Sequence, residues 1–394
     1  FLMVGLVNGV SMGAGVVIAR YFGAKDYDRI QKTIHTLLAF GLVAGALLTV
    51  VGVALSPVML RLMDTPETVL PDSISYFRTY FTGSLAFVLY NICMGILQAV
   101  GDSRHPLQYL IISSLVNVVL DLLFVGVFHM GVWSAAAATA ISQLVSMALC
   151  LLRLMRSERA YRVSLRKIRF DRRALLEILQ NGLPAGLQST VFSLSNVVIQ
   201  SAINSFGSTV VAGNSAASNL EGFIYTGMNA FAQAAVTFTS QNVGARRYDN
   251  LDRVMRNCLL CVTVAGLFLG CGAYFGGEVL LHFYSTDEAV VAAGLSRMQI
   301  ICTAYFLCGI MDTLASCLRG RGYSVIPMIV SLVGSCLLRL VWIATIFRMF
   351  RSTGTLYISY PISWALTAGV HLICLLVVRK KMNDQLKEEA HLAA

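Results

Sequence analysis

An internal repeat constrains the fold of this 394-residue chain more than any other feature of its sequence. When residues 23–115 are moved forward by 221 positions, with no gap, they meet similar residues in both the apolar segments and the polar loops. A constant offset of this kind predicts two copies of one unit, and two-fold repeats in membranes are mostly a transporter architecture. The matched positions include Gly23-Ala24 with Gly244-Ala245, Tyr27-Asp28 with Tyr248-Asp249, Thr65, Glu67 and Val69 with Thr286, Glu288 and Val290, Leu97 with Leu318, Gly101 with Gly322, and Pro106 with Pro327.

The composition is that of a membrane protein. Hydrophobic residues make up 57% of the chain and charged residues 13%, whereas soluble domains carry about 25% charged residues. Apolar windows of about 20 residues, which suffice to cross the hydrocarbon core of a bilayer, recur along the whole length. These windows are continuously apolar rather than alternating, so they are helices and not strands of a barrel. We predict an all-α polytopic membrane protein.

Eleven spanning helices are predicted, and their odd number is informative. The helix 180–204 has no partner under the offset, and Phe1 maps inside the helix 209–240. The chain begins without Met and without a basic signal-peptide region, so we expect it to lack its first helix, the full protein having twelve helices in two parallel six-helix repeats. The predicted spans are 1–20, 33–55, 75–98, 107–128, 132–152, 180–204, 209–240, 257–276, 295–318, 327–347 and 355–378.

These spans predict four regions. Residues 1–152 form an N-lobe with helices 2–6, and residues 175–380 form a C-lobe with helices 7–12. Residues 153–174 are a basic linker, either an amphipathic segment on anionic lipid or a solvated tether. Residues 381–394 are a polar tail.

The distribution of basic residues predicts the orientation. The net charge is +10, yet 24 of the 30 Lys and Arg residues lie in loops on one side, including the linker and the tail. Such a bias predicts a protein of the cell (inner or plasma) membrane, with those loops and the C-terminus on the cytoplasmic side. The basic charge therefore sets orientation, and we expect membrane lipid but no nucleic acid as a partner.

Three acids lie inside predicted spans, where a charge costs roughly 3 kcal/mol. They are Asp121, Glu221 and Asp312, and Arg339 lies in the helix that repeats the Asp121 helix. Each acid is either a cation-coupling carboxylate that takes up H⁺ or Na⁺, or one half of a structural pair. Arg339 is interpreted as a structural counter-charge.

Several amides mark a polar face inside the spans, which usually lies against a water-filled cavity or another helix. Asn117 lies one turn before Asp121, and Asn8 and Asn229 are equivalent under the repeat. Gln188, Asn196 and Gln200 follow one another along the helix 180–204. We predict that these six residues line the cavity.

No pattern of catalytic, cofactor-binding or metal-binding residues is present. The sequence contains no spacing typical of a catalytic triad, a phosphate-binding loop or a zinc site, and the ten cysteines lie in or beside apolar segments, where they act as small packing residues. We therefore predict a protein that is not an enzyme and has no cofactor or metal.

The paired motifs resemble those of the multidrug and toxic compound extrusion (MATE) family. They are GVVIARYFGAKD with FTSQNVGARRYD, and ILQAVGDSRHP with CLRGRGYSVIP, while NVVLDLLFV and NGLPAGLQ are similar to the fifth and seventh helices of the family. The resemblance implies two lobes around a central cavity and exchange of Na⁺ or H⁺ for amphipathic, often cationic, organic compounds by alternating access. Some members use an acid on helix 7 with an Asp on helix 10; here Asp312 is on helix 10, and we hypothesise that Glu221 on helix 8 supplies the other carboxylate.

Two alternatives remain beside an antiporter for small molecules. One is a lipid-linked oligosaccharide flippase of the wider superfamily, which the scarcity of deep basic residues other than Arg339 disfavours. The other is a membrane receptor or scaffold without transport. In each case we expect a monomer.

Overall fold

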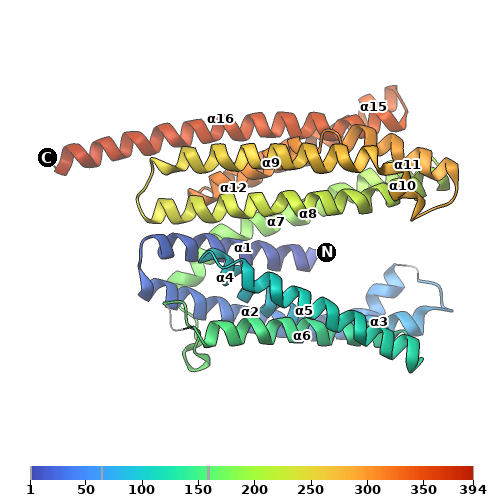
Figure 1. The fold of residues 1–394 in the computed structure, drawn as a ribbon, viewed down its shortest axis with the longest axis horizontal. Coiled ribbons are helices and arrows are strands. Elements are labelled where there is room, and N and C mark those ends of the chain that lie inside the picture. The colour runs from blue at the N-terminus through green and yellow to red at the C-terminus, as the bar shows by residue number, and fades with distance from the viewer. Residues whose placement is uncertain (1, 64, 158–159, 394) are drawn as a thin grey trace. The chain divides into compact units, whose positions relative to one another are not determined.

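The computed structural model describes residues 2–63, 65–157 and 160–393, and within these ranges the chain forms helices and no strand (Figure 1). The α-helices are α1 (Leu2–Gly23), α2 (Tyr27–Leu62), α3 (Leu70–Thr82), α4 (Ser84–Ala99), α5 (Arg104–Asp121), α6 (Trp133–Met155), α7 (Arg172–Asn204), α8 (Ser208–Gly244), α9 (Asn250–Phe275), α10 (Gly277–His282), α11 (Glu288–Ile301), α12 (Tyr305–Gly320), α13 (Val325–Ser331), α14 (Leu338–Ala344), α15 (Ile346–Met349) and α16 (Thr353–Ala393). Two π-helical segments, η1 (Leu122–Val127) and η3 (Leu332–Leu337), and a 3₁₀ turn, η2 (Leu165–Lys167), complete them.

Each of the eleven predicted spans coincides with one helix or with a series of consecutive helices. The span 75–98 is broken between α3 and α4, and the span 295–318 consists of α11 and α12, which meet at 47°. Among the described residues, seven helical segments are long and apolar enough to cross a membrane, or eight if that bent pair counts as one. The helices α7 and α8 are not among them although each is more than 30 residues long, because polar side chains interrupt their apolar stretches.

The chain divides into two compact units. The N-unit is residues 6–183, and the C-unit is residues 184–394 together with 1–5. The division falls inside α7, so residues 175–183, which we had predicted to open the C-lobe, belong to the N-unit. The reason is a close approach of two glycines: a Cβ on Gly13 would lie 2.2 Å from the backbone nitrogen of Gly182, so α1 and the first part of α7 are in backbone contact.

The internal repeat is visible in the backbone of the loops. Lys25 and Arg246, which the offset of 221 makes equivalent, both have left-handed φ values, of 57° and 55°. The equivalent glycines Gly101 and Gly322 have φ values of 90° and 94°, a conformation that glycine adopts without steric cost. Equivalent positions thus make equivalent turns, which confirms the duplication.

The predicted linker packs against the helices of the N-unit and is not a solvated tether. We call residues 160–171 the strap; two of its side chains, Tyr161 and Val163, are buried in the core of the N-unit. The Nε2 atom of His35 in α2 accepts a hydrogen bond from the backbone N–H of Ser164 (3.1 Å), and Thr36 accepts one from the N–H of Asp171 (3.0 Å). The backbone of the strap is thus held by side chains of α2.

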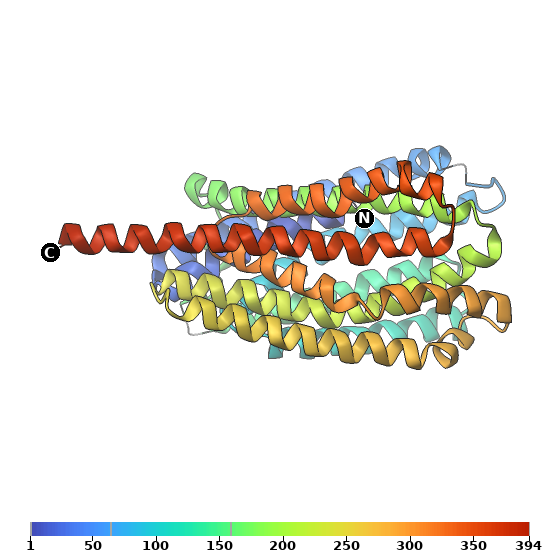
Figure 2. The ribbon, with the colours of Figure 1, turned by 90° about the horizontal axis from the view of Figure 1, so that it is seen from above.

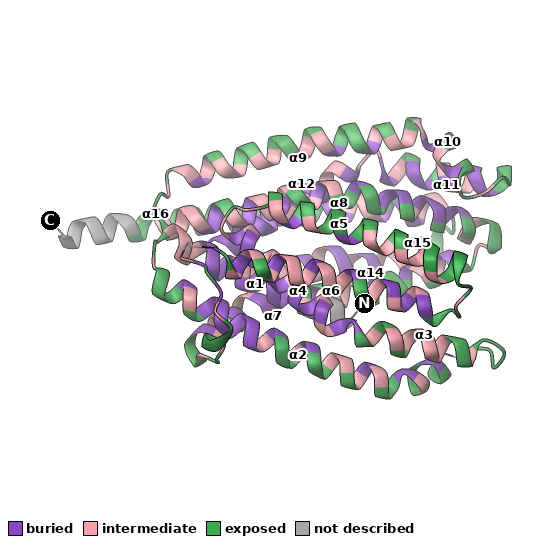
Figure 3. Ribbon diagram, turned by 60° about the horizontal axis from the view of Figure 1, so that its bottom comes forward, coloured by how far each residue is buried: buried purple, intermediate pink, exposed green. Residues whose placement is uncertain are grey.

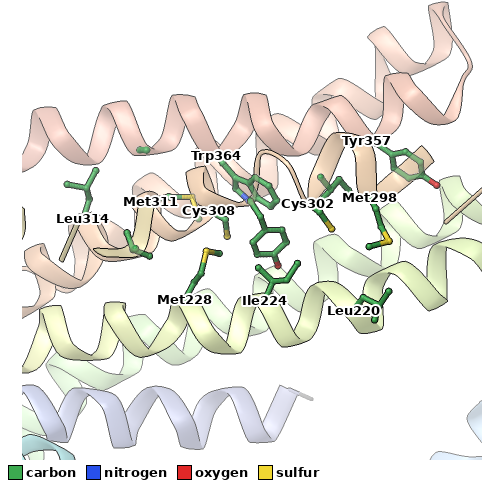
Figure 4. Close-up of a cluster of buried hydrophobic side chains, with 14 of the residues drawn as sticks. Leu220, Ile224, Met228, Met298, Cys302, Cys308, Met311, Leu314, Tyr357 and Trp364 are labelled. Carbon is green, nitrogen blue, oxygen red and sulfur yellow. The ribbon is translucent and has the colours of Figure 1, made fainter. Parts of the chain in front are cut away.

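The core of the C-unit surrounds α12, which packs against α8, α9 and α16 (Figure 2). Ile224 and Met228 of α8 lie on one side of this core, and Cys308 and Met311 of α12 with Trp364 of α16 lie on the other (Figure 4). On the outer face, exposed residues recur along α9, as Figure 3 shows. An apolar helix with a large exposed face is what a helix in contact with lipid requires.

Candidate functional site

A buried ion pair joins α8 to α11 inside the C-unit. The Nε and Nη2 atoms of Arg297 donate to the two carboxylate oxygens of Glu221, each at 2.7 Å, and the Nη1 atom donates to Asn214 Oδ1 at 2.7 Å. Glu221 and Arg297 are only 6% and 4% exposed. Asn214 in turn donates to Gln200 Oε1 at 3.4 Å, so one predicted cavity residue belongs to this network. A bidentate pair of this kind satisfies both charges.

Arg297 is a buried charged residue that the sequence analysis did not single out. It is one of the basic residues outside the 24 that we counted on the cytoplasmic side, and it lies near the start of the predicted span 295–318. The available signal for burial was its position inside that span. The helix that contains it also contains the apolar residues Val290, Val291 and Met298. The partner of Glu221 is therefore Arg297, and not Arg339, which we had interpreted as a structural counter-charge.

Arg339 lies against aromatic rings and not against a carboxylate. Its guanidinium carbon is 4.2 Å from the ring centre of Tyr360 and 5.6 Å from that of Trp364, and its Nε atom donates to Ser363 Oγ at 2.8 Å. Among the described residues, no acid forms an ion pair with Arg339, and its buried Nη2 atom has no hydrogen-bond partner. Cation–π contacts therefore replace the predicted counter-charge role. Arg297 shares the ring of Tyr360, at 5.4 Å.

The C-unit buries more basic charge than the sequence indicated. Arg297, Arg319, Arg321 and Arg339 are each less than one-tenth exposed, although we had interpreted Arg339 as the only deep basic residue. Arg319 and Arg321 are among the 24 basic residues that we had counted in loops, but Arg319 lies in the last turn of α12 and Arg321 follows that helix directly. Both are buried. Arg319 donates from Nη2 to Gln188 Oε1 at 2.6 Å, so Gln188 of α7 is a hydrogen-bond partner inside the C-unit.

Asp312 is the other acid inside a predicted span of the C-unit, and it has no partner among the described residues. It lies in the middle of α12, it is half-buried, and within the described ranges it makes no hydrogen bond or ion pair. Arg319 and Tyr225 are the groups whose charges act on it. A carboxylate without a hydrogen-bond or ion-pair partner is available to bind a proton or a cation.

In the N-unit, the polar residues Asp121 and Asn117 lie one turn apart at the end of α5. Asp121 Oδ1 and Asn117 Nδ2 are buried, and neither has a hydrogen-bond partner among the described residues. The same is true of Gln143 Oε1 on α6, the helix that packs against α5. The π-helical segment η1 begins immediately after Asp121, and such segments often mark functional positions because they disturb the regular hydrogen-bond ladder.

Within the part of the chain that the structure describes, no hydrogen bond joins the other predicted cavity residues to one another. Asn8 in the N-unit and Asn196 in the C-unit are exposed, and Asn229 is half-buried. Within the described ranges, no three His, Cys, Asp or Glu side chains cluster as metal ligands would. Among the described residues, the C-unit therefore contains one unpaired span acid (Asp312), one paired acid (Glu221) and the buried arginines, and the N-unit contains the unpaired Asp121.

Comparison with known proteins identifies the family. The MatE family model matches residues 1–123 and 184–345. The chain is 26% identical over 339 residues to the probable multidrug resistance protein YoeA of Bacillus subtilis (84% of this chain, 73% of YoeA) and 20% identical over 391 residues to the multidrug export protein MepA of a Staphylococcus aureus strain (98% and 85%).

The fold is also that of solved structures. A multidrug resistance MATE family transporter of the MOP superfamily, solved in an outward-facing conformation, superposes with a TM-score of 0.90 at 20% identity, covering 97% of this chain and 86% of that one. The apolar helices and the family match together make this a multi-pass membrane protein, and they exclude the receptor or scaffold alternative. The chain belongs to the MatE family, whose members are membrane transporters and not enzymes.

Proposed function

We propose that this protein is a cation-coupled antiporter, in which inward movement of Na⁺ or H⁺ drives the export of small amphipathic, often cationic, organic compounds by alternating access. Membership of the MatE family and the multidrug export names of the relatives support this proposal. The coupling ion is a substrate of the transport cycle and not a resident cofactor.

The observation that carries the proposal is the unpartnered carboxylate of Asp312 inside α12. A charged carboxylate away from water is costly unless a proton or a cation neutralises it. Neutralisation and release therefore change the relative stability of conformations that differ in how much water reaches Asp312, and this difference is what couples an ion to a conformational equilibrium.

Asp121 is a second coupling carboxylate, in the N-unit. Its buried Oδ1 atom lacks a partner, and Asn117 one turn earlier adds an amide to the same helix face. Glu221 is a different case, because Arg297 already neutralises its charge and both of its oxygens accept hydrogen bonds. We therefore assign coupling to Asp312 and Asp121, and a structural role to Glu221.

Ion-driven efflux from vesicles tests these roles. The full-length protein is reconstituted, loaded with a cationic dye, and exposed to an inward Na⁺ gradient or an inward H⁺ gradient. We expect one gradient to drive efflux, and Asp312→Asn and Asp121→Asn to abolish that dependence. Glu67→Gln, which removes an exposed acid, is the matched control. Full, ion-dependent efflux by both Asp variants would refute the assignment, and absence of efflux by the wild type under either gradient would refute the antiporter.

A second candidate is the transport of compounds with an anionic group, as in the lipid-linked oligosaccharide flippases of the superfamily. The buried arginines of the C-unit favour it, and most of all Arg339, whose Nη2 atom has no partner in the described part of the chain. Parallel assays with a cationic dye and an anionic dye separate the two candidates, because only the second predicts faster transport of the anionic dye and its loss in Arg339→Gln.

For the orientation we propose that the strap, the C-terminus and the loops rich in Lys and Arg face the cytoplasm of the cell membrane, and that the protein acts as a monomer. The 24 basic residues on one side support this orientation. Labelling of single cysteines introduced after residue 380 and in the loop at residue 66, in intact cells, tests it: an impermeant reagent should reach only the second.

A further inference from the structure

A pocket of about 300 Å³ lies in the C-unit, and Asp312 is not among its lining residues. Four segments contribute to it: the connection between α8 and α9, the first turn of α9, the turn after α12, and the end of α16. Its polar lining residues are Tyr248, Asp249, Asp252, Arg321, Arg379 and Asn383.

Arg321 is the unusual residue of this pocket. Its side chain is only 6% exposed, and in the described part of the chain it has no hydrogen bond or ion pair; its Nε and Nη1 atoms are both buried without a partner. The turn that carries it is fixed, because Gly322 has a φ of 94° and donates from its N–H to Arg319 O at 2.8 Å. A buried donor without an acceptor is costly, and more so when it is charged.

The neighbouring charges leave Arg321 uncompensated. Asp252 is already paired with Arg379, whose Nη2 atom lies 2.7 Å from its Oδ2 atom. Asp249 is exposed. Burial lowers the pKa of Arg321, and the charge of Asp252 acts in the opposite direction, but a guanidinium remains protonated in proteins. The pocket therefore presents a permanent positive charge, with the hydroxyl of Tyr248 and the amide of Asn383 as further donors.

The pocket lies beside the part of α16 where the apolar sequence gives way to basic residues. The helix α16 has 41 residues, about twice the length that a bilayer requires, and Arg379, Lys380 and Lys381 mark the level at which it leaves the apolar region. The phosphate groups of lipid headgroups lie at this level, and soluble phosphate compounds reach it from the adjacent solution.

We propose that this pocket is a binding site for a phosphate group, with Arg321 as its main ligand. Guanidinium groups match the geometry of phosphate oxygens better than ammonium groups do. The site is specific to one half of the protein, since under the offset of 221 Val100 stands where the C-unit has Arg321, and Gln31 where it has Asp252. The phosphate belongs either to an anionic lipid headgroup or to a soluble phosphate compound.

Thermal unfolding of the purified full-length protein tests the proposal. In the first arm, the protein in detergent is titrated with inorganic phosphate against chloride at equal ionic strength. In the second arm, it is held in nanodiscs of phosphatidylcholine with or without phosphatidylglycerol. A ligand that binds the folded state raises the melting temperature, so a rise in the first arm identifies soluble phosphate and a rise in the second arm alone identifies a lipid headgroup.

Matched variants decide whether the effect belongs to this pocket. Arg321→Gln should weaken phosphate binding by about ten-fold or more, as expected for a hydrogen-bonded charge. Arg253→Gln removes the same charge from an exposed position outside the pocket and should leave the titration unchanged. Asp249→Asn removes a repulsive charge and should tighten binding roughly two- to five-fold; Asp249 makes no capping hydrogen bond to α9, so this variant keeps the helix start.

The proposal is overturned if neither arm raises the melting temperature of the wild type, or if Arg321→Gln responds as the wild type does. Should Arg321→Gln fail to fold, an unchanged response of Asp249→Asn would overturn it in the same way. None of these readouts depends on transport.

Discussion

Glu221 of α8 and Arg297 of α11, which are 76 residues apart in the sequence, form a bidentate ion pair at 2.7 Å for each nitrogen–oxygen contact. Both side chains are buried. The pair fixes α8 against α11, and it also removes Glu221 from the set of acids that are free to bind an ion.

The first prediction concerns this pair. Glu221→Gln leaves the guanidinium of Arg297 buried and uncompensated, so the free energy of unfolding should fall by about 3–5 kcal/mol. Thermal unfolding in detergent measures the loss, with Glu67→Gln as the exposed control. The double variant Glu221→Leu with Arg297→Met removes both charges and should regain much of the stability. An unchanged melting temperature in Glu221→Gln would contradict the structural role.

A second prediction concerns the contact between α1 and α7. Gly13→Ala places a methyl group where the backbone of Gly182 lies, and such overpacking costs about 1–3 kcal/mol or more. Gly222→Ala is the matched control, because a Cβ on Gly222 meets no atom within 4 Å, and alanine in a helix should then stabilise by up to about 1 kcal/mol. The two melting temperatures should therefore move in opposite directions. A melting temperature of Gly13→Ala that equals or exceeds that of the wild type would show that α1 and α7 are not in backbone contact.

The third prediction concerns pH and the turn between α4 and α5. Burial raises the pKa of Asp102, but hydrogen bonds from the side chain and backbone of His105, with Arg153 nearby, outweigh it and lower the pKa of the carboxyl. A carboxyl whose pKa is lower in the folded state stabilises the fold above its unfolded pKa of about 3.9. This stability is lost as the pH falls below that value towards the folded pKa.

Melting curves of wild type and Asp102→Asn, measured between pH 7 and pH 3, check this prediction. The variant should be less stable at pH 7, and the difference should shrink below about pH 4. A constant difference across the range would mean that the ionised carboxylate contributes nothing.

The fourth prediction concerns the strap. Removing the acceptor in His35→Ala leaves the N–H of Ser164 without its partner, so the strap should detach more often. Limited trypsin digestion in detergent, with fragments identified by mass spectrometry, should show faster cleavage after Arg162 and Arg166. His282→Ala, which changes an exposed histidine far along the chain, serves as the control. Equal cleavage rates in His35→Ala and wild type would indicate that the solvated tether was the right interpretation.

The sequence allowed the repeat, the helices and their order to be predicted, because these depend on local hydrophobicity and on self-similarity along the chain. The left-handed turns at Lys25 and Arg246 bear out the offset at the level of single residues. Candidate acids could be found for the same reason, since any charge inside an apolar run stands out.

The partner of each charge could not be predicted. Arg297 lies at a helix end in the sequence, yet the packing of α11 on α8 brings it to Glu221, while Arg339 meets rings of α16 instead of an acid. Likewise the sequence predicts that Arg321 lies in a loop, but the end of α16 and the start of α9 enclose it in a pocket.

The sequence by itself determined that this is a duplicated, all-helical membrane protein with a few acids inside its spans. Only the tertiary structure decided which acids are neutralised and which are free, because burial and pairing depend on helices distant in sequence. In a low-dielectric interior the nearest opposite charge or hydrogen-bond partner governs what an ionisable group does, and that neighbour is a property of packing. Glu221 and Asp312 look alike in the sequence, and the presence of Arg297 beside one of them is what separates a structural residue from a candidate for ion coupling.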